Sequence, residues 1–131
     1  MPTTDLPADL VELARVLVGL PWFKWRSGMR MVSPSGANFR AVFERGGLRF
    51  VMESRGRDGF FGGEDLPDLY DPATLGCLIA LVSELAWGPV SIRWVPHLVG
   101  GVWYAETAGA LQARGPTEAH ALIALALQVT P

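Results

Sequence analysis

The stretch that decides the fold is "DPATLGCLIALVSELAWGP", residues 71–89. Asp71 followed directly by Pro72 is typical of a helix start, because aspartate caps the first turn and proline at the first helical position loses no hydrogen bond. Apolar residues occupy almost every side of the predicted helix 72–87, and Gly88 with Pro89 predicts its end. A helix that is apolar all round is expected at the centre of a fold or in a subunit interface.

The chain on either side of this central helix has strand-like alternation, with a further helix at each end. Leucines spaced by three and four residues predict a helix that begins after Asp5, and Thr117 caps a last helix that runs to residue 128. Three strands are predicted before the central helix, near 29–33, 38–44 and 48–53, and three after it. We therefore predict a single α+β domain over 1–131, in the order α-βββ-α-βββ-α, with antiparallel sheets packed against helices.

The segment "NFRAVFERGGLRFVMES", residues 38–54, predicts a hairpin. A two-residue turn at Gly46-Gly47 sets a register in which Glu44 lies opposite Arg49 and Arg40 lies opposite Glu53. Each opposite-charge pair is worth only some tenths of a kcal/mol at a surface. Pairing within the hairpin thus accounts for several of its arginines.

Composition narrows the class of protein. The chain has 131 residues, of which half are apolar and 18% are charged, a balance that favours a folded core over disorder. A single cysteine excludes an internal disulfide, and one cysteine with two histidines cannot on their own complete a four-ligand zinc site. No secretion signal and no apolar run of membrane length is seen, so we predict a cytoplasmic protein with no cofactor and no membrane partner.

Charge is segregated along the chain. Residues 22–57 hold eight basic groups against two acidic ones, whereas residues 58–71 hold five acids and no base. Such a split predicts either that the two regions neutralise each other or that one of them meets a charged partner. The sequence leaves both alternatives open.

The stretch "PWFKWRSGMR", residues 21–30, mixes aromatic and basic side chains and leads the set of candidate partner-binding residues. An irregular loop is predicted over 56–70, and it adds two more phenylalanines and an acidic segment. The candidates are Trp22, Lys24, Trp25, Arg26, Arg30, Arg55, Arg57, Phe60 and Phe61, with Glu64, Asp65 and Asp68 in the acidic loop. Proteins that bind single-stranded nucleic acid use such a mixture, with aromatic side chains that stack on bases and basic side chains that bind phosphates. The sequence pI near 5.6 and the absence of a polybasic run disfavour it.

No catalytic residue is assigned. Cys77 with His97 or His120 is a conceivable nucleophile and base. A thiol in an apolar helix is, however, usually an inert packing group. The acids from Glu64 to Asp71 offer oxygen ligands for calcium or magnesium, but their spacing fits no dedicated loop, so no metal is predicted.

Three stretches together carry a resemblance: "FKWRSGM" (23–29), "LPDLYDPATLGCLIALVSELAWG" (66–88) and "GPTEAHALIALAL" (115–127). They resemble a set of small proteins encoded by tailed bacteriophages and prophages, in which a segment like the second is the most recognisable mark. That family has no assigned activity, so the resemblance implies a viral source and no reaction. The chain departs from the pattern at Ser27, where proline is common, and at His120, where an acid would complete the capping arrangement with Thr117.

These observations favour a non-enzymatic, phage-encoded accessory protein that binds another protein of the host or the phage. Inhibition of host defence, including the anti-CRISPR type, is the use that this analogy suggests. A self-associating virion or assembly component, with helix 72–87 as the contact between copies, is the first alternative. A weak nucleic-acid-binding module that uses residues 22–30 is the second.

Overall fold

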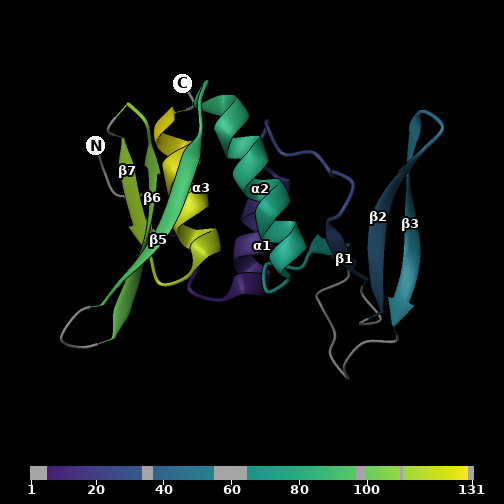
Figure 1. The fold of residues 1–131 in the computed structure, drawn as a ribbon. Coiled ribbons are helices and arrows are strands. Elements are labelled where there is room, and N and C mark those ends of the chain that lie inside the picture. Colours follow the sequence, from purple (N-terminus) through teal and green to yellow (C-terminus); the bar gives the residue numbers. More distant parts are fainter. Residues whose placement is uncertain (1–5, 34–36, 55–64, 97–99, 110, 130–131) are drawn as a thin grey trace. The chain divides into compact units, whose positions relative to one another are not determined.

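A computed structural model describes residues 6–33, 37–54, 65–96, 100–109 and 111–129. Its described residues form three helices and two antiparallel sheets, which confirms the predicted α+β class (Figure 1). The chain divides into two compact units, Asp9–Cys77 and residues 1–8 with Leu78–Pro131. Each unit is described by itself below, and the single domain stays a prediction.

The unit Asp9–Cys77 holds helix α1 (Leu10–Val18) and a four-stranded sheet in the order β3-β2-β1-β4. The strands are β1 (Arg30–Val32), β2 (Asn38–Glu44), β3 (Gly47–Ser54) and β4 (Leu66–Pro67). Leu13 and Leu17 of α1 are buried, and α1 packs beside Leu66 of β4, which is also buried. The helix begins later than predicted, because Asp9 rather than Asp5 accepts the cap hydrogen bond, from the Val11 N–H.

The prediction of an irregular loop over 56–70 is wrong at β4. Leu66 lies opposite Val32 and Pro67 lies opposite Met31, so two residues of the segment extend the sheet beyond β1. Burial of Leu66 and Leu69 explains why this short piece is held in place. Proline is compatible with the position because β4 is an edge strand.

The hairpin of β2 and β3 forms as predicted, but the predicted register is wrong by two residues. The turn lies at Arg45-Gly46, where φ is +40° and +82°, so Glu44 pairs with Gly47 and Ala41 pairs with Phe50. Positive φ at both central residues is the signature of the primed turns that match strand twist. A shift of two residues leaves every side chain on its predicted face, because side chains alternate with a period of two.

Both predicted ion pairs of the hairpin form despite the shifted register. The Arg49 guanidinium lies 3.4 Å from the Glu44 carboxylate, and the Arg40 guanidinium lies 3.1 Å from the Glu53 carboxylate. Each pair is now diagonal rather than directly opposite. Long side chains span that diagonal distance.

Helix α2 (Pro72–Leu85) begins as predicted and ends two residues before the predicted residue 87. The Asp71 carboxylate accepts a hydrogen bond from the Thr74 N–H at 3.0 Å, which confirms its role as the cap. Leu78, Leu81 and Val82 are buried. The exposed residues of α2 are small or polar: Pro72, Ala73, Gly76 and Glu84. Three of its large apolar residues, Leu75, Ile79 and Leu85, are half-buried. Self-association through this helix stays a prediction.

Gly76 lies in α2 with nothing among the described residues within 4 Å of the place where a Cβ would sit. Close packing therefore does not explain this glycine. We expect Gly76→Ala to raise the free energy of unfolding by about 1 kcal/mol, because glycine is the poorer helix former by that amount. Urea denaturation of the two proteins measures the difference, and a loss of stability would show that the site is crowded.

The unit that includes Leu78–Pro131 contains a three-stranded sheet in the order β5-β6-β7 and helix α3 (Glu118–Val129). Its strands are β5 (Val90–Pro96), β6 (Gly101–Thr107) and β7 (Gln112–Gly115). Helix α3 packs on β6 and β7 (Figure 1). Ala105 of β6 and Ala113 of β7 are paired and buried, and their small side chains let the helix approach the sheet. Seven of its residues, from Ala119 to Ala126, are buried.

Thr117 caps α3 as predicted, and His120 replaces the expected acid. The Thr117 hydroxyl accepts a hydrogen bond from the His120 N–H at 3.2 Å and lies 2.7 Å from Nδ1 of the same ring. Nε2 lies 2.7 Å from the Pro7 carbonyl oxygen. Since a carbonyl only accepts, Nε2 carries the proton in the neutral ring and Nδ1 accepts from Thr117. The buried imidazole thus closes the cap and ties Pro7 to α3.

Candidate functional site

The aromatic residues of segment 21–30 are used within their own unit. Trp25 makes edge-to-face contacts with Phe23 and Phe50, at ring-centroid distances of 5.5 Å and 5.4 Å. Trp22 is half-buried, whereas Lys24 is exposed. Trp25 therefore covers the hairpin, and its contacts support the hairpin rather than an open stacking platform.

Arg30, from β1, is engaged by carboxylates on three sides. Its guanidinium lies 3.2 Å from Glu53, 3.6 Å from Asp68 and 3.8 Å from Asp71. Arg40, from β2, binds Asp71 at 2.5 Å and Glu53 at 3.1 Å, and it donates to the Gly28 carbonyl at 2.8 Å. Of the two alternatives for the segregated charge, internal neutralisation is the one observed at these two arginines.

Asp71 is the centre of this network. Its side chain is only 6% exposed and accepts hydrogen bonds from Arg40 and from both the N–H and the hydroxyl of Thr74. Burial by itself raises the pKa of Asp71, but the hydrogen bonds from Arg40 and Thr74 outweigh burial and lower the pKa below its ordinary value. The carboxylate is therefore ionised and joins the start of α2 to β2.

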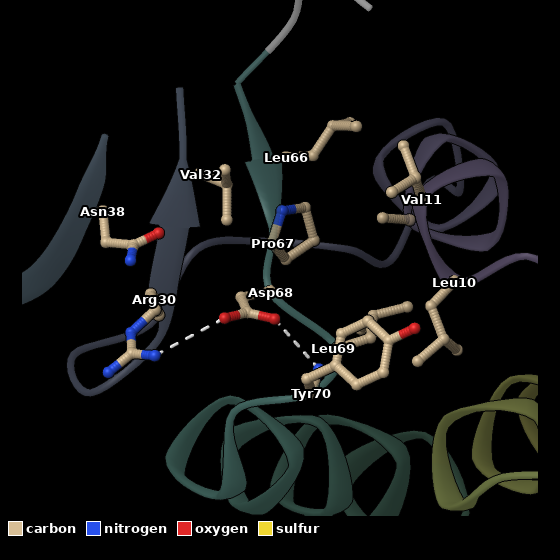
Figure 2. A pocket seen from close by; sticks show the side chains of 11 residues that line it. Leu10, Val11, Arg30, Val32, Asn38, Leu66, Pro67, Asp68, Leu69 and Tyr70 are labelled. Carbon is tan, nitrogen blue, oxygen red and sulfur yellow. Dashed lines mark hydrogen bonds and ion pairs between the residues drawn. The ribbon is translucent and has the colours of Figure 1, made fainter. Parts of the chain in front are cut away.

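A cavity of about 100 Å³ lies between α1, the ends of β1 and β2, and the segment around β4. Figure 2 shows its apolar side formed by Leu10, Val11 and Leu66, with Arg30 and Asp68 paired at its polar side. Asp68 also accepts a hydrogen bond from the Tyr70 N–H at 3.0 Å. Ligand pockets usually enclose roughly 300–1,000 Å³. The cavity is thus too small for a drug-sized ligand, and its two charged groups, Arg30 and Asp68, are already paired with each other.

The conceivable nucleophile, Cys77, is held in a structural contact. Its thiol donates to the Ser27 carbonyl at 3.3 Å, and burial raises the pKa of the thiol above its ordinary value. A thiol with a raised pKa is a poor nucleophile. His120 uses Nδ1 in the α3 cap and Nε2 in the bond to the Pro7 carbonyl, and His97 lies outside the described residues.

Other candidate residues lie outside the part of the chain that the structure describes: Arg55, Arg57, Phe60, Phe61 and Glu64. Asp65 is described and exposed. Over the described ranges, no group of three or more histidine, cysteine, aspartate or glutamate side chains is placed to hold a metal ion. In the same residues, no helix has both the length and the apolar character that a membrane span needs.

The most exposed large apolar side chain of the described residues is Trp87, which is not among the candidate residues predicted from the sequence. Trp87 is 96% exposed and has a φ of +58°. The Gly88 N–H bonds to the Ser83 carbonyl and the Trp87 N–H bonds to the Glu84 carbonyl, which is the Schellman pattern at the end of α2. Glycine usually occupies the left-handed position of this motif, and here tryptophan does.

A hollow of about 220 Å³ adjoins this side chain, and Trp87, Leu111 and Val129 are among the residues that line it. Leu111 is 43% exposed. It is two residues from the buried Ala113, so strand alternation alone would predict that both side chains face the core. We call Trp87, Leu111 and this hollow the Trp87 corner. One feature of the sequence could have indicated this exposure. Trp87 stands directly before Gly88-Pro89, where the helix is predicted to end.

Comparisons of the chain with protein-family models, with curated proteins and with solved structures find no match. The resemblance to small phage-encoded proteins therefore stays a prediction. Any assignment of function has to be argued from the surfaces described above.

Proposed function

We propose that this chain is a non-enzymatic accessory protein that acts by binding another protein through the Trp87 corner. One observation carries the proposal: a tryptophan is held almost fully exposed, at a backbone conformation that costs an L-residue about 1–2 kcal/mol. The left-handed conformation closes α2 through the Schellman hydrogen bonds, but the fold does not need a tryptophan there, because glycine adopts the same conformation without strain. Strain kept at an exposed aromatic residue is a reason to look for function at that place.

The chemistry of the corner suits a protein partner. Tryptophan is enriched among the few residues that dominate binding energy at protein interfaces, where it fills a pocket of the partner. Leu111 and the hollow beside Trp87 add apolar surface around that anchor. The contacts favour a nucleic-acid partner less. Arg30 and Arg40, two of the basic groups that would bind phosphate, are already paired with carboxylates.

The phage resemblance adds the biological setting of the proposal. A small phage-encoded binding protein would act in the cytoplasm of the bacterial host, on host machinery or on a defence system. An inhibitor of the anti-CRISPR type is one member of this class. This part of the proposal rests on analogy to the family and not on the Trp87 corner.

We expect Trp87→Gly to abolish partner binding and to stabilise the fold. Glycine relieves the left-handed strain but loses more chain entropy on folding, so the net gain is about 0.5–1 kcal/mol. The measurement combines urea denaturation with retention of bacterial proteins on the immobilised wild type and the variant. A protein retained by the wild type and lost from a more stable variant cannot be explained by misfolding.

Tyr70→Ala is the matched control, because Tyr70 is 69% exposed and lies in the other unit. It should retain the same proteins as the wild type. Equal retention by wild type and Trp87→Gly, or no protein that distinguishes them, would contradict binding through the Trp87 corner.

A further inference from the structure

One face of the β2-β3 hairpin carries only apolar side chains and belongs to no site described above. Side chains alternate between the two faces of a strand, so residues that lie opposite each other in an antiparallel pair share a face. The face consists of three such pairs: Phe39 with Met52, Ala41 with Phe50, and Phe43 with Leu48. We call these residues the apolar hairpin face.

Part of the apolar hairpin face is open to solvent. Ala41 is buried, and Trp25 packs edge-to-face on Phe50. Phe43, however, is 64% exposed and Met52 is 55% exposed. The other residues of the face are half-buried: Phe39, Leu48 and Phe50. Neighbouring exposed apolar residues of this kind indicate an interaction surface, whereas single scattered ones do not.

The two acids of the hairpin are already paired on its opposite face. The Glu44 carboxylate lies 3.4 Å from the Arg49 guanidinium. The Glu53 carboxylate lies 3.2 Å from the guanidinium of Arg30 and 3.1 Å from that of Arg40. Neither carboxylate is therefore free to neutralise a cation beside the apolar hairpin face.

Arg45 is such a cation, in the turn at the end of the apolar hairpin face. It is exposed and makes no hydrogen bond or ion pair with the residues that the structure describes. Its φ of +40° is a left-handed conformation that glycine, asparagine or aspartate usually supplies in a turn of this type. Strain kept at an exposed and unpaired arginine is a reason to look for a ligand at that place.

We infer that the apolar hairpin face and Arg45 bind an acidic, amphipathic segment of a partner protein, in which Asp or Glu flanks apolar side chains. The apolar side chains of that segment cover Phe43 and Met52. One of its carboxylates binds the Arg45 guanidinium, whose planar donors fit a carboxylate with two parallel hydrogen bonds.

Composition and charge favour this partner. Aromatic residues, methionine and arginine are enriched at the centres of protein interfaces, whereas lysine, aspartate and glutamate are depleted there. At Arg45 the segregated charge of the chain is thus used for a charged partner, in contrast to the internal neutralisation at Arg30 and Arg40. This surface lies in the unit Asp9–Cys77 and the Trp87 corner lies in the other unit, so each can fail its test without the other.

Selection from a displayed library of random linear peptides tests the charge of the ligand. Only peptides that Trp87→Gly also retains are scored, so that ligands of the Trp87 corner do not enter the count. We expect the wild type to enrich Asp and Glu about twofold or more over the library, next to apolar residues. Arg45→Glu should lose that enrichment because repulsion replaces attraction. Arg114→Glu, at an exposed arginine of the other unit, is the matched control and should keep it.

The affinity for one selected acidic peptide, measured by fluorescence anisotropy, separates binding from folding. Phe43→Ser and Arg45→Gly should each raise its dissociation constant at least about tenfold. Arg45→Gly also relieves the left-handed strain, so its loss of binding cannot be explained by a strained or misfolded turn.

Three results would overturn the inference. The first is a selection that yields no peptide or shows no acidic enrichment. The second is a selected peptide that binds Arg45→Glu as tightly as it binds the wild type. The third is tighter binding of oligothymidylate or of phosphatidylserine vesicles than of the peptide, since the partner would then be a nucleic acid or a membrane.

Discussion

Asp71→Ala is expected to lower the free energy of unfolding by about 3 kcal/mol, the largest loss among the substitutions considered. The change removes the cap of α2, which the Thr74 N–H and hydroxyl both use. It also leaves Arg40, whose side chain is only 22% exposed, without its closest carboxylate. Removing one partner of a buried ion pair costs more than the pair contributes, because the remaining charge stays desolvated. Guanidinium denaturation measures the loss.

The pH dependence of stability tests whether the negative charge of Asp71, and not only its shape, stabilises the fold. Hydrogen bonds hold the pKa of Asp71 below its ordinary value of 3.8 in the folded state, so the unfolded chain binds a proton more readily than the folded chain does. The stability from Asp71 is therefore complete above its unfolded pKa and is lost as the pH falls through the lower folded pKa. The difference in unfolding free energy between wild type and Asp71→Asn should shrink below about pH 4. A pH-independent difference would contradict the role of the ionised carboxylate.

Gly115→Ala is expected to cost about 2–3 kcal/mol, although it adds a single methyl group. A Cβ at Gly115 would lie 2.4 Å from the His120 Cβ and 3.0 Å from the Ala121 nitrogen. Gly115 ends β7, and α3 starts three residues later, so the helix folds back directly onto the strand end. The contacted atoms belong to the first turn of that helix and to the root of a buried side chain, which cannot rotate away. The midpoint of thermal unfolding should fall accordingly.

Gly109→Ala is the matched control for the β7 junction. Gly109 is an exposed turn residue whose nearest described atom to an added Cβ, the Thr107 hydroxyl oxygen, lies 3.8 Å away. The free energy of unfolding of Gly109→Ala should stay within about 0.5 kcal/mol of that of the wild type. Equal effects of the two substitutions would mean that loss of glycine flexibility, and not the contact with His120, explains the change at Gly115.

Local chemistry made several features predictable from the sequence. The caps at Asp71 and Thr117 follow from side chains that reach backbone N–H groups two or three residues away. The faces of the hairpin follow from the period of two, which survives a register error of two residues. The candidate binding residues were less predictable, because aromatic and basic residues look alike in sequence whether they pack, pair or stay exposed. Trp25 and Arg30 are engaged within the fold, whereas Trp87, predicted to end helix 72–87, is almost fully exposed.

The sequence by itself determined the α+β class, the apolar helix that begins at Pro72, the caps of α2 and α3, and which side chains share a face of the hairpin, because each depends on residues close in the chain. Only the tertiary structure decided the position of the turn at Arg45-Gly46 and the short strand at Leu66. It also decided the ion pairs of Arg30 and Arg40 with Asp71, and the exposure of Trp87. These features depend on groups brought together from distant positions. Burial, pairing and register are settled only when the whole of each unit has packed.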